Sequence, residues 1–431
     1  MKKKIISLVL VLTYLLTSLA SAIEPMDVNS KASILIDASD GHELYGENAD
    51  TKQFPASITK LMTALLVVEN VDNFDELVIA KESAYEDLSD GGSSVGIKEE
   101  EEMSVDNLLI CLLVASANEV ANILAEHVSG SVDKFVELMN TRATELGLTG
   151  THFVNAHGLH NDDHYTTARD IAKLAMEVQK HERLREICSM DKATIPATNI
   201  GKERFFYTTN SLISEWKELG YKYSRANGMK TGSTTPAGFC LVASAEYEGT
   251  ELISVVLGAE KDENGKKGNF VESKRLLIWG FENFRDATLV NSSDTVCEVK
   301  IRSGKNQDYV TGHASENFSL MMPIDFDKSK VEYRFTALKE EFEAPVKKGD
   351  EIGTVTVVYE GKEYAALPVV ASYDVERSEV EYTKNKVKDF FGSTLSVVCV
   401  ALALLVFFVV LFIIIKKKKD KRQRKQRRRY R

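Results

Sequence analysis

Residues 54–60 read FPASITK, and no other segment says more about the architecture of this chain. A proline near its start and an apolar run over 61–68 predict a helix from about residue 55 to residue 70. Ser57 and Lys60 are three residues apart, so their side chains share one face of that helix. Near a helix N-terminus, free backbone amides and the macrodipole favour developing negative charge on the Ser57 oxygen. A serine hydroxyl becomes a good nucleophile when a base takes its proton, and Lys60 can be that base if burial or a neighbouring cation lowers its pKa.

The Ser-x-x-Lys spacing alone does not identify a catalytic serine, because it recurs in this chain. Three other pairs share it: Ser131 with Lys134, Ser189 with Lys192, and Ser214 with Lys217. Ser57 differs because an apolar helix follows it directly. Two further motifs, in a fixed order along the chain, strengthen the interpretation.

The first of these motifs is Ser116-Ala117-Asn118, which interrupts a strongly apolar helical stretch. Seen alone, such a triplet can be a polar helix junction that satisfies its own backbone. In an acyl-transfer site, Ser116 can pass a proton to the leaving amine and Asn118 can hold a substrate amide. A second Ser-x-Asn triplet at 315–317 falls in a predicted β region.

The second motif, Lys230-Thr231-Gly232, occurs once and is followed by Ser233. An exposed turn before a strand is the alternative interpretation. In a catalytic site, Lys230 and Thr231 can hold a carboxylate, and Gly232 admits the close approach of a substrate backbone. Lys230 can also be the cation that lowers the pKa of Lys60. The three motifs together supply the groups for acyl transfer through a covalent serine ester.

The pattern between the motifs predicts an α+β domain around an antiparallel sheet. Helical periodicity and capping alternate with hairpin signals, and the βαβ rhythm of a parallel sheet is missing from the pattern. We expect strands at 32–37, 42–45, 239–244 and 252–257, and helices at 55–70, 105–114, 118–127 and 272–281.

After residue 285 the pattern changes to short strands separated by turns. Strand-like runs occur at 296–301, 319–322, 331–338, 352–359 and 363–370. They predict a small all-β sandwich domain over residues 286–375. Residues 376–394 are rich in charge and are interpreted as a stalk.

The two ends of the chain indicate export and membrane anchoring. Residues 1–22 combine three lysines, an apolar run and a closing Ala-Ser-Ala, which is typical of a cleaved signal peptide, although an uncleaved anchor has a similar pattern. Residues 395–415 carry no charge and are long enough to span a bilayer of about 30 Å. The basic tail 416–431 marks the cytoplasmic side. We therefore expect a single-pass cell-membrane protein, anchored C-terminally, with its catalytic domain outside the cytoplasm.

Charge and cysteine content exclude several other classes. The chain has a net charge of −10, and the segment between signal peptide and tail carries about −24, which argues against nucleic acid as a partner. The five cysteines lie far apart without a CxxC pair, and this pattern indicates neither a disulfide framework nor a metal site.

With these residues in view, the chain resembles the serine D-alanyl-D-alanine carboxypeptidases among the low-molecular-mass penicillin-binding proteins. The resemblance runs from about residue 32 to residue 370. Besides the three motifs, it rests on FPAS at 54–57, NAHGL at 155–159, HYTTARD at 164–170 and VKKGD at 346–350.

The resemblance implies a fold, a reaction and roles for the motif residues. Residues 23–285 would form a penicillin-binding, β-lactamase-like transpeptidase domain, followed by the β-domain and one transmembrane helix. The enzyme would remove the terminal D-alanine from peptidoglycan stem pentapeptides, β-lactams would inhibit it covalently, and neither a cofactor nor a metal is implied. Ser57 would be the nucleophile, Lys60 the general base and Ser116 the proton relay. The substrate would be bound by Asn118, Lys230, Thr231, Gly232 and Ser233. The backbone amides of Ser57 and Ser233 would form the oxyanion hole.

One position departs from the family pattern. An arginine that helps to bind the terminal carboxylate often stands shortly before the helix after the motif strand, and here Asn269 stands there. Lys266, Lys267 or Lys274 can substitute, or Lys230 and Thr231 can bind the carboxylate without help. The chain could therefore be a DD-endopeptidase or a β-lactamase with the same acyl-serine chemistry, and a non-catalytic wall-binding protein is the remaining alternative.

Overall fold

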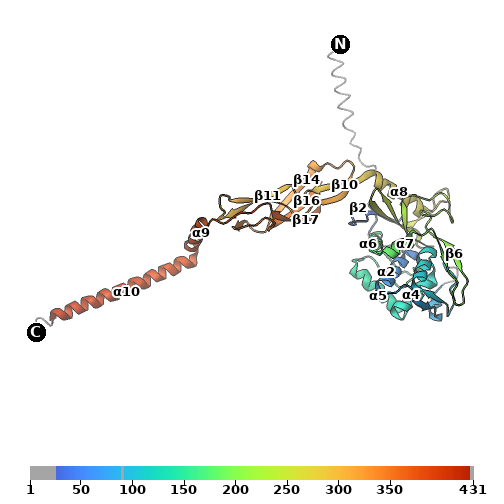
Figure 1. Cartoon of the computed structure of the whole chain (residues 1–431), viewed down its shortest axis with the longest axis horizontal. Coiled ribbons are helices and arrows are strands. Elements are labelled where there is room, and N and C mark those ends of the chain that lie inside the picture. Colours follow the sequence, from blue (N-terminus) through green and yellow to red (C-terminus); the bar gives the residue numbers. More distant parts are fainter. Residues whose placement is uncertain (1–25, 89–91, 428–431) are drawn as a thin grey trace, which may run out of the picture. The chain divides into compact units, whose positions relative to one another are not determined.

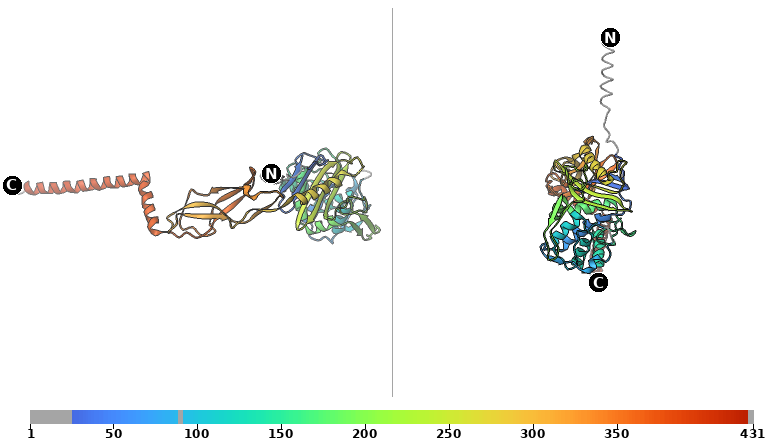
Figure 2. Two further views of the ribbon diagram at one scale, coloured as in Figure 1. Left: turned by 90° about the horizontal axis from the view of Figure 1, so that it is seen from above. Right: turned by 90° about the vertical axis from the view of Figure 1, so that its right-hand side faces the viewer.

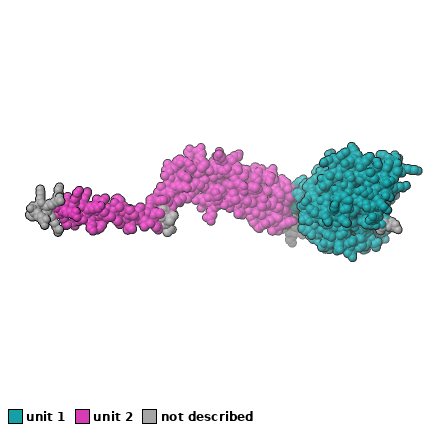
Figure 3. Space-filling view, turned by 90° about the horizontal axis from the view of Figure 1, so that it is seen from below, with its two compact units in different colours: residues 1–286, 321–326 teal, residues 287–320, 327–431 magenta. Residues whose placement is uncertain are grey.

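The computed structural model describes residues 26–88 and 92–427 (Figure 1), which form two compact units. The first comprises residues up to 286 together with 321–326, and the second comprises 287–320 and 327 onward (Figure 3). The predicted signal peptide, residues 1–22, lies outside the described residues.

The first unit is built on a five-stranded antiparallel sheet. Its strand order is β2-β1-β9-β8-β7, so β7 is an edge strand. The strands are β1 (Ala32–Asp37), β2 (Glu43–Glu47), β7 (Ala226–Thr234), β8 (Gly238–Tyr247) and β9 (Thr250–Ala259). The α+β class and the antiparallel sheet predicted from the sequence are confirmed.

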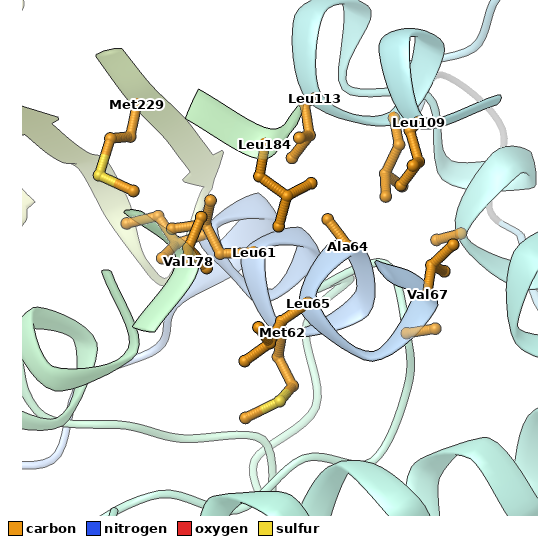
Figure 4. Packing of buried hydrophobic residues seen from close by; sticks show 14 of the residues in the cluster. Leu61, Met62, Ala64, Leu65, Val67, Leu109, Leu113, Val178, Leu184 and Met229 are labelled. Carbon is orange, nitrogen blue, oxygen red and sulfur yellow. The ribbon is translucent and has the colours of Figure 1, made fainter. Parts of the chain in front are cut away.

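Helices cover both faces of this sheet. α8 (Gly268–Asn283) packs against β8 and β9 on one face, and α6 (Ala168–Gln179) packs against β9 and β1 on the other (Figure 2). The α6 face belongs to the larger hydrophobic core, in which α2 (Lys60–Asn70) is central. Figure 4 shows this core around α2, with side chains labelled from α2, α3, α6, α7, β7 and the segment before Ser116.

The remaining elements of the first unit are short. They are η1 (Ala56–Thr59), β3 (Leu77–Ile79), η2 (Glu82–Tyr85), β4 (Glu102–Ser104), α3 (Val105–Ile110), η3 (Cys111–Ala115), α4 (Asn118–Ser129), α5 (Val132–Glu145), α7 (Glu182–Ser189), β5 (Lys192–Ile195) and β6 (Arg204–Tyr207).

Two predicted helices are interrupted where the first two sequence motifs lie. The helix expected over 55–70 opens as the 3₁₀ turn η1 and becomes α-helical only at Lys60, because Ala56 adopts a left-handed backbone with φ of 49°. The helix expected over 105–114 ends in the π-helical turn η3, after which Ser116 is also left-handed with φ of 65°. Both departures place a serine at a sharp change of chain direction.

The second unit contains the expected all-β domain. A six-stranded sheet has the order β14-β16-β17-β12-β11-β15, and a separate pair joins β10 to β13. Its strands are β10 (Phe284–Val290), β11 (Thr295–Arg302), β12 (Tyr309–Ala314), β13 (Phe318–Pro323), β14 (Val331–Ala337), β15 (Glu341–Glu343), β16 (Glu351–Tyr359) and β17 (Lys362–Ala371), with a short turn η4 (Lys328–Lys330).

Two helices close the described part of the chain. α9 (Glu379–Gly392) occupies most of the segment interpreted as a stalk, and α10 (Thr394–Arg427) follows after one residue. Residues 397–424 of α10 have the length and the apolar composition to cross a membrane.

Candidate active site

The turn that carries Ser57 is held in a strained conformation by its neighbours. The left-handed backbone at Ala56 costs free energy, of order 1–3 kcal/mol, and persists only where surrounding contacts fix it. Its carbonyl accepts a hydrogen bond from Thr59 Oγ1 at 2.8 Å. Gly158 packs against the same carbonyl so closely that a Cβ there would lie 1.9 Å from the oxygen. The Ser57 backbone is therefore positioned from two sides.

A buried histidine completes the support of this turn. The amide of Val154 donates to His164 Nδ1 at 3.2 Å, which leaves the ring proton on Nε2. That nitrogen donates to Thr59 Oγ1 at 2.8 Å, and Thr59 in turn donates to Ala56. Burial lowers the pKa of His164 to about 3, so the ring stays neutral and this chain of hydrogen bonds keeps its direction.

Lys60 points at Ser57 from the first turn of α2. Its Nζ lies 3.0 Å from Ser57 Oγ, 2.7 Å from Asn118 Oδ1 and 2.6 Å from the carbonyl oxygen of His157. The side chain is fully buried. Burial first, and then the positive charge of Lys230, hold the pKa of Lys60 well below its usual range. A neutral amine beside a serine hydroxyl can accept the hydroxyl proton.

The second motif meets the third across the site. Ser116, at the end of η3, accepts a hydrogen bond from Lys230 Nζ at 2.9 Å, and Lys230 also donates to the carbonyl of Thr231 at 2.9 Å. Lys230 is almost fully buried, and burial lowers its pKa to about 7. The side-chain oxygen of Asn118 accepts a hydrogen bond from Lys60 Nζ.

Strand β7 brings its motif directly against the Ser57 turn. A Cβ at position 232 would lie 2.7 Å from the Pro55 carbonyl oxygen and 3.0 Å from the Ser57 amide nitrogen. Only glycine fits this approach, which explains the third residue of the motif. Thr231 donates to Thr209 Oγ1 at 2.6 Å, and Ser233 is exposed.

Sequence reasoning missed the groups that hold the segment 93–97 beside the site. The Ser93 carbonyl accepts a hydrogen bond from the amide of Asn118 at 2.8 Å. The buried Glu119 carboxylate accepts from Ser94 Oγ and from the amides of residues 95 and 96. The Arg204 guanidinium donates to the carbonyls of the same two residues. Such contacts carry no local sequence signal because Arg204 lies more than 100 residues away.

His157 was part of the quoted family pattern, but its contacts were not predicted. The Leu159 amide donates to His157 Nδ1 at 3.1 Å, so Nε2 carries the proton and donates to Asp87 Oδ2 at 3.0 Å. Asn122, one turn after Asn118 on α4, donates to the other oxygen of Asp87 at 2.6 Å. The hydrogen bonds of Asp87 with His157 and Asn122 hold the loop that contains His157, whose carbonyl oxygen accepts from Lys60.

Asn269 is not placed to bind a substrate carboxylate. It is buried in the first turn of α8, and its Nδ2 donates to the carbonyl of Cys240 at 3.1 Å. Of the three lysines that could substitute, Lys274 Nζ binds the carbonyl of Lys222. Lys267 forms an ion pair with Glu218 and lies 5.6 Å from the centre of the Phe239 ring.

The contact with Phe239 places Lys267 beside the strand that pairs with the motif strand. Phe239 is the cross-strand partner of Ser233, so the two side chains share one face of the sheet. The ammonium of Lys267 therefore lies on the face that carries Thr231 and Ser233.

The three competing Ser-x-x-Lys pairs have structural roles. Ser131 caps α5 by accepting from the amide of Lys134. Ser189 donates to the carbonyl of Glu186, and Ser214 accepts from the amide of Trp216. Ser57 is the one of the four whose Oγ has a hydrogen bond to the lysine ammonium group among the contacts of the described residues.

Comparison with known proteins agrees with this geometry. Residues 19–261 match the family Peptidase S11, D-alanyl-D-alanine carboxypeptidase, and residues 284–377 match the C-terminal domain of penicillin-binding protein 5.

Individual relatives cover nearly the whole chain. D-alanyl-D-alanine carboxypeptidase DacF of Bacillus subtilis is 32% identical over 388 residues, covering 87% of this chain and 95% of the relative. DacC of Escherichia coli is also 32% identical, covering 87% and 92%. The crystal structure of penicillin-binding protein 5 from Haemophilus influenzae superposes with a TM-score of 0.66 at 30% identity, covering 83% of this chain and all of that one.

Proposed function

This chain belongs to the peptidase S11 family of D-alanyl-D-alanine carboxypeptidases, and we propose that Ser57, Lys60 and Ser116 carry out its reaction. The chain is a serine carboxypeptidase of the bacterial cell wall and a penicillin-binding protein by family and by fold. The resemblance inferred from the sequence is thereby confirmed. The assignment of roles to individual residues is our proposal, and its main support is the buried Lys60 amine 3.0 Å from Ser57 Oγ.

The first half of the reaction forms an ester on Ser57. Neutral Lys60 takes the hydroxyl proton while Oγ attacks the carbonyl carbon of the penultimate D-alanine. The negative charge on the carbonyl oxygen is held by the backbone amides of Ser57 and Ser233. Ser116 gives its proton to the nitrogen of the terminal D-alanine, and the C–N bond breaks as this amino acid leaves. Lys230, bonded to Ser116, returns a proton to it.

The second half of the reaction hydrolyses the ester. Lys60 passes the proton that it took to Lys230, which restores both amines, and Lys60 then removes a proton from a water molecule, which attacks the ester carbonyl. The C–O bond breaks, and Ser57 recovers its proton. A β-lactam undergoes the same acylation of Ser57. The amine that is released when its ring opens stays attached to the acyl group and does not leave the site, so the penicilloyl ester blocks the hydrolysis step.

The same residues hold the end of the peptide. Lys230, Thr231 and Gly232 line the proposed carboxylate site, with Asn118 near the peptide amide. Because Asn269 is used inside the core, we propose that Lys267 supplies the second positive charge for the carboxylate.

We also propose that the chain is exported and held in the cell membrane by α10. The apolar segment 397–424 and the basic tail 416–431 support a single-pass topology with a cytoplasmic C-terminus and an extracytoplasmic catalytic domain. The corresponding proposed segments are the signal peptide 1–22, the catalytic domain 23–285, the β-domain 286–375, the stalk 376–394, the membrane helix 395–415 and the tail 416–431.

Mass spectrometry of the penicillin adduct tests the assignment. We expect one penicilloyl group on Ser57, no adduct on the Ser57→Ala variant, and an unchanged adduct on the matched Ser131→Ala variant. Release of D-alanine from a pentapeptide mimic should be lost in Ser57→Ala and should be unchanged in Ser131→Ala. An adduct on Ser131, Ser189 or Ser214 would overturn the assignment, and rapid turnover of the adduct would favour a β-lactamase.

A further inference from the structure

The first unit contains a cavity of about 330 Å³ that the proposed reaction does not use. Its walls come from α6 and α7 on one side and from β7, β8 and the start of β9 on the other. No residue of the three sequence motifs is among the residues that line it. α7 packs against β7, which carries Lys230, and against η3, which leads to Ser116. The cavity therefore adjoins the elements that position two of the proposed catalytic groups.

Three buried apolar residues form the floor of this cavity. Val178, Cys188 and Met229 are 0%, 6% and 4% exposed, and the first and the last are labelled in Figure 4. Met229 immediately precedes Lys230 in β7. Cys188 lies against the same strand, since a Cβ added at Gly228 would be 3.5 Å from the Cys188 Cβ atom. Such a floor suits an aliphatic chain, which gains free energy when it leaves water.

The charged residues of the lining are mostly acidic. They comprise four glutamates and one cation, Arg185. Glu186 is neutralised by an ion pair with Arg183 at 2.6 Å. The other three glutamates have no ion-pair partner among the residues that the structure describes, and they are Glu182, Glu246 and Glu251. The lining therefore attracts a positive charge.

Two of these carboxylates are placed where they repel each other. Glu246 and Glu251 are directly opposite each other in the pairing of β8 with β9, and both line the cavity. Like charges in such a cross-strand pair are destabilising. Glu251 Oε1 accepts hydrogen bonds from Gln179 at 2.8 Å and from Asn227 at 3.3 Å, but both donors are neutral. A positive group bound between the two carboxylates would remove the repulsion.

We propose that this cavity binds a primary ammonium at the end of an aliphatic chain. The ammonium lies between Glu246 and Glu251, where its three N–H groups reach both carboxylates, and the methylene groups lie on the apolar floor. A metal ion would leave the floor without a contact, and a quaternary ammonium has no N–H group to donate. The side chain of a diamino acid in a peptide and a free diamine both have the required chemistry. Neither depends on the roles proposed for Ser57, Lys60 and Ser116.

Isothermal titration calorimetry of the full-length chain in detergent tests the proposal with 1,5-diaminopentane as the probe. The titration is made at constant ionic strength, with and without prior acylation by penicillin. We expect one diamine per chain and the same affinity in both states. 1-Pentanol, which has the same chain length but no charge, should bind about tenfold more weakly, because it cannot pair with a carboxylate. Binding that is lost on acylation would place the diamine in the catalytic site and overturn the proposal.

Three variants at exposed positions separate the cavity from the general negative charge of the chain. Glu246→Gln should weaken binding by about fivefold, because it removes one charge of the pair. Arg185→Met should strengthen binding by about two- to threefold, because it removes the cation of the lining. Glu248→Gln, in the turn between β8 and β9, is the matched control and should leave the affinity unchanged. Equal weakening by the two glutamine variants, or none by Glu246→Gln, would contradict the proposal.

Two peptides distinguish the sources of the ammonium, again on the acylated chain. One is a tripeptide that ends in lysine, and the other is the same tripeptide with its lysine ε-amine acetylated. If the free-amine peptide binds about tenfold tighter than the diamine, the occupant is a peptide side chain. If it binds equally or more weakly, the occupant is a free diamine. An acetylated peptide that binds as tightly as the free-amine peptide, and more tightly than the diamine, would overturn the ammonium contact.

Discussion

The two walls of the active site are built in different ways. The wall that carries the nucleophile, residues 54–60, is fixed by contacts with distant segments, including a buried hydrogen bond from His164 and the close packing of Gly158. The opposite wall is the edge strand β7, whose motif residues make few contacts: Lys230 binds Ser116 and a neighbouring carbonyl, and Thr231 binds Thr209. The first wall fixes geometry, whereas the second offers charge and an accessible backbone.

The two lysines show the same division. Burial and the charge of Lys230 hold the pKa of Lys60 well below its usual range, which favours the neutral amine that a base needs. Burial lowers the pKa of Lys230 to about 7, so that this lysine keeps part of its charge at pH 7. Environments that separate the pKa values of two like groups separate their roles as well. Changes in the nucleophile wall should therefore reduce the rate of acylation, and changes in the β7 wall should mainly weaken binding.

The largest effect is expected from Lys60→Met. Loss of the base should lower the rate of acylation by penicillin by about 10²–10⁴-fold. Stopped-flow or gel-based adduct formation measures this rate. Lys134→Met, in the pair with the same spacing at Ser131, is the matched control and should acylate normally. An unchanged rate of acylation in Lys60→Met would contradict the proposal that Lys60 is the base.

Gly232→Ala tests the contact between the two walls. The added methyl group would lie 2.7 Å from the Pro55 oxygen, so β7 must move away from the Ser57 turn. A displacement approaching 1 Å lowers the rate by about 10²-fold. D-alanine release and thermal unfolding are measured together. Gly392→Ala, where a Cβ meets open space, should leave both unchanged.

The pH dependence tests the charge on the β7 wall. As pH rises through about 7, Lys230 loses its proton and with it the attraction for the substrate carboxylate. The value of kcat/KM for a pentapeptide mimic should fall by up to about tenfold per pH unit above 7. The same peptide with a methyl ester at its C-terminus has no carboxylate for Lys230 to attract, so its kcat/KM should fall less steeply above pH 7. Parallel profiles for the two peptides would contradict the proposed carboxylate contact.

Lys267→Met should have the smallest effect. The ammonium is partly exposed and paired with Glu218, so its loss should raise KM by about two- to fivefold with kcat little changed. Steady-state kinetics on the carboxylate peptide measures this. Lys274→Met, whose ammonium binds a backbone carbonyl instead, is the control. A fall in kcat with unchanged KM would place Lys267 outside the carboxylate site.

The sequence predicted the antiparallel sheet and the β-domain because these depend on periodicity. It predicted the meeting of Ser57, Lys60, Ser116 and Lys230 because the three motifs together form a known set. It did not predict the left-handed backbone at Ala56, since alanine gives no local signal for it and the compensating contacts come from about 100 residues away. The acceptors of Lys60 were also missed in part, because a carbonyl oxygen such as that of His157 belongs to the backbone of any residue.

The position of β7 at the end of the sheet has a consequence for solubility. An accessible strand edge can pair with a strand from another chain and so begin aggregation, and catalysis prevents this edge from being covered permanently. A buried charge within such a strand opposes this pairing, because a partner strand that shifted β7 would have to disturb it. Lys230 is such a charge, and it stands in the middle of the strand. The same lysine that is proposed to bind substrate thus also discourages self-association of the enzyme.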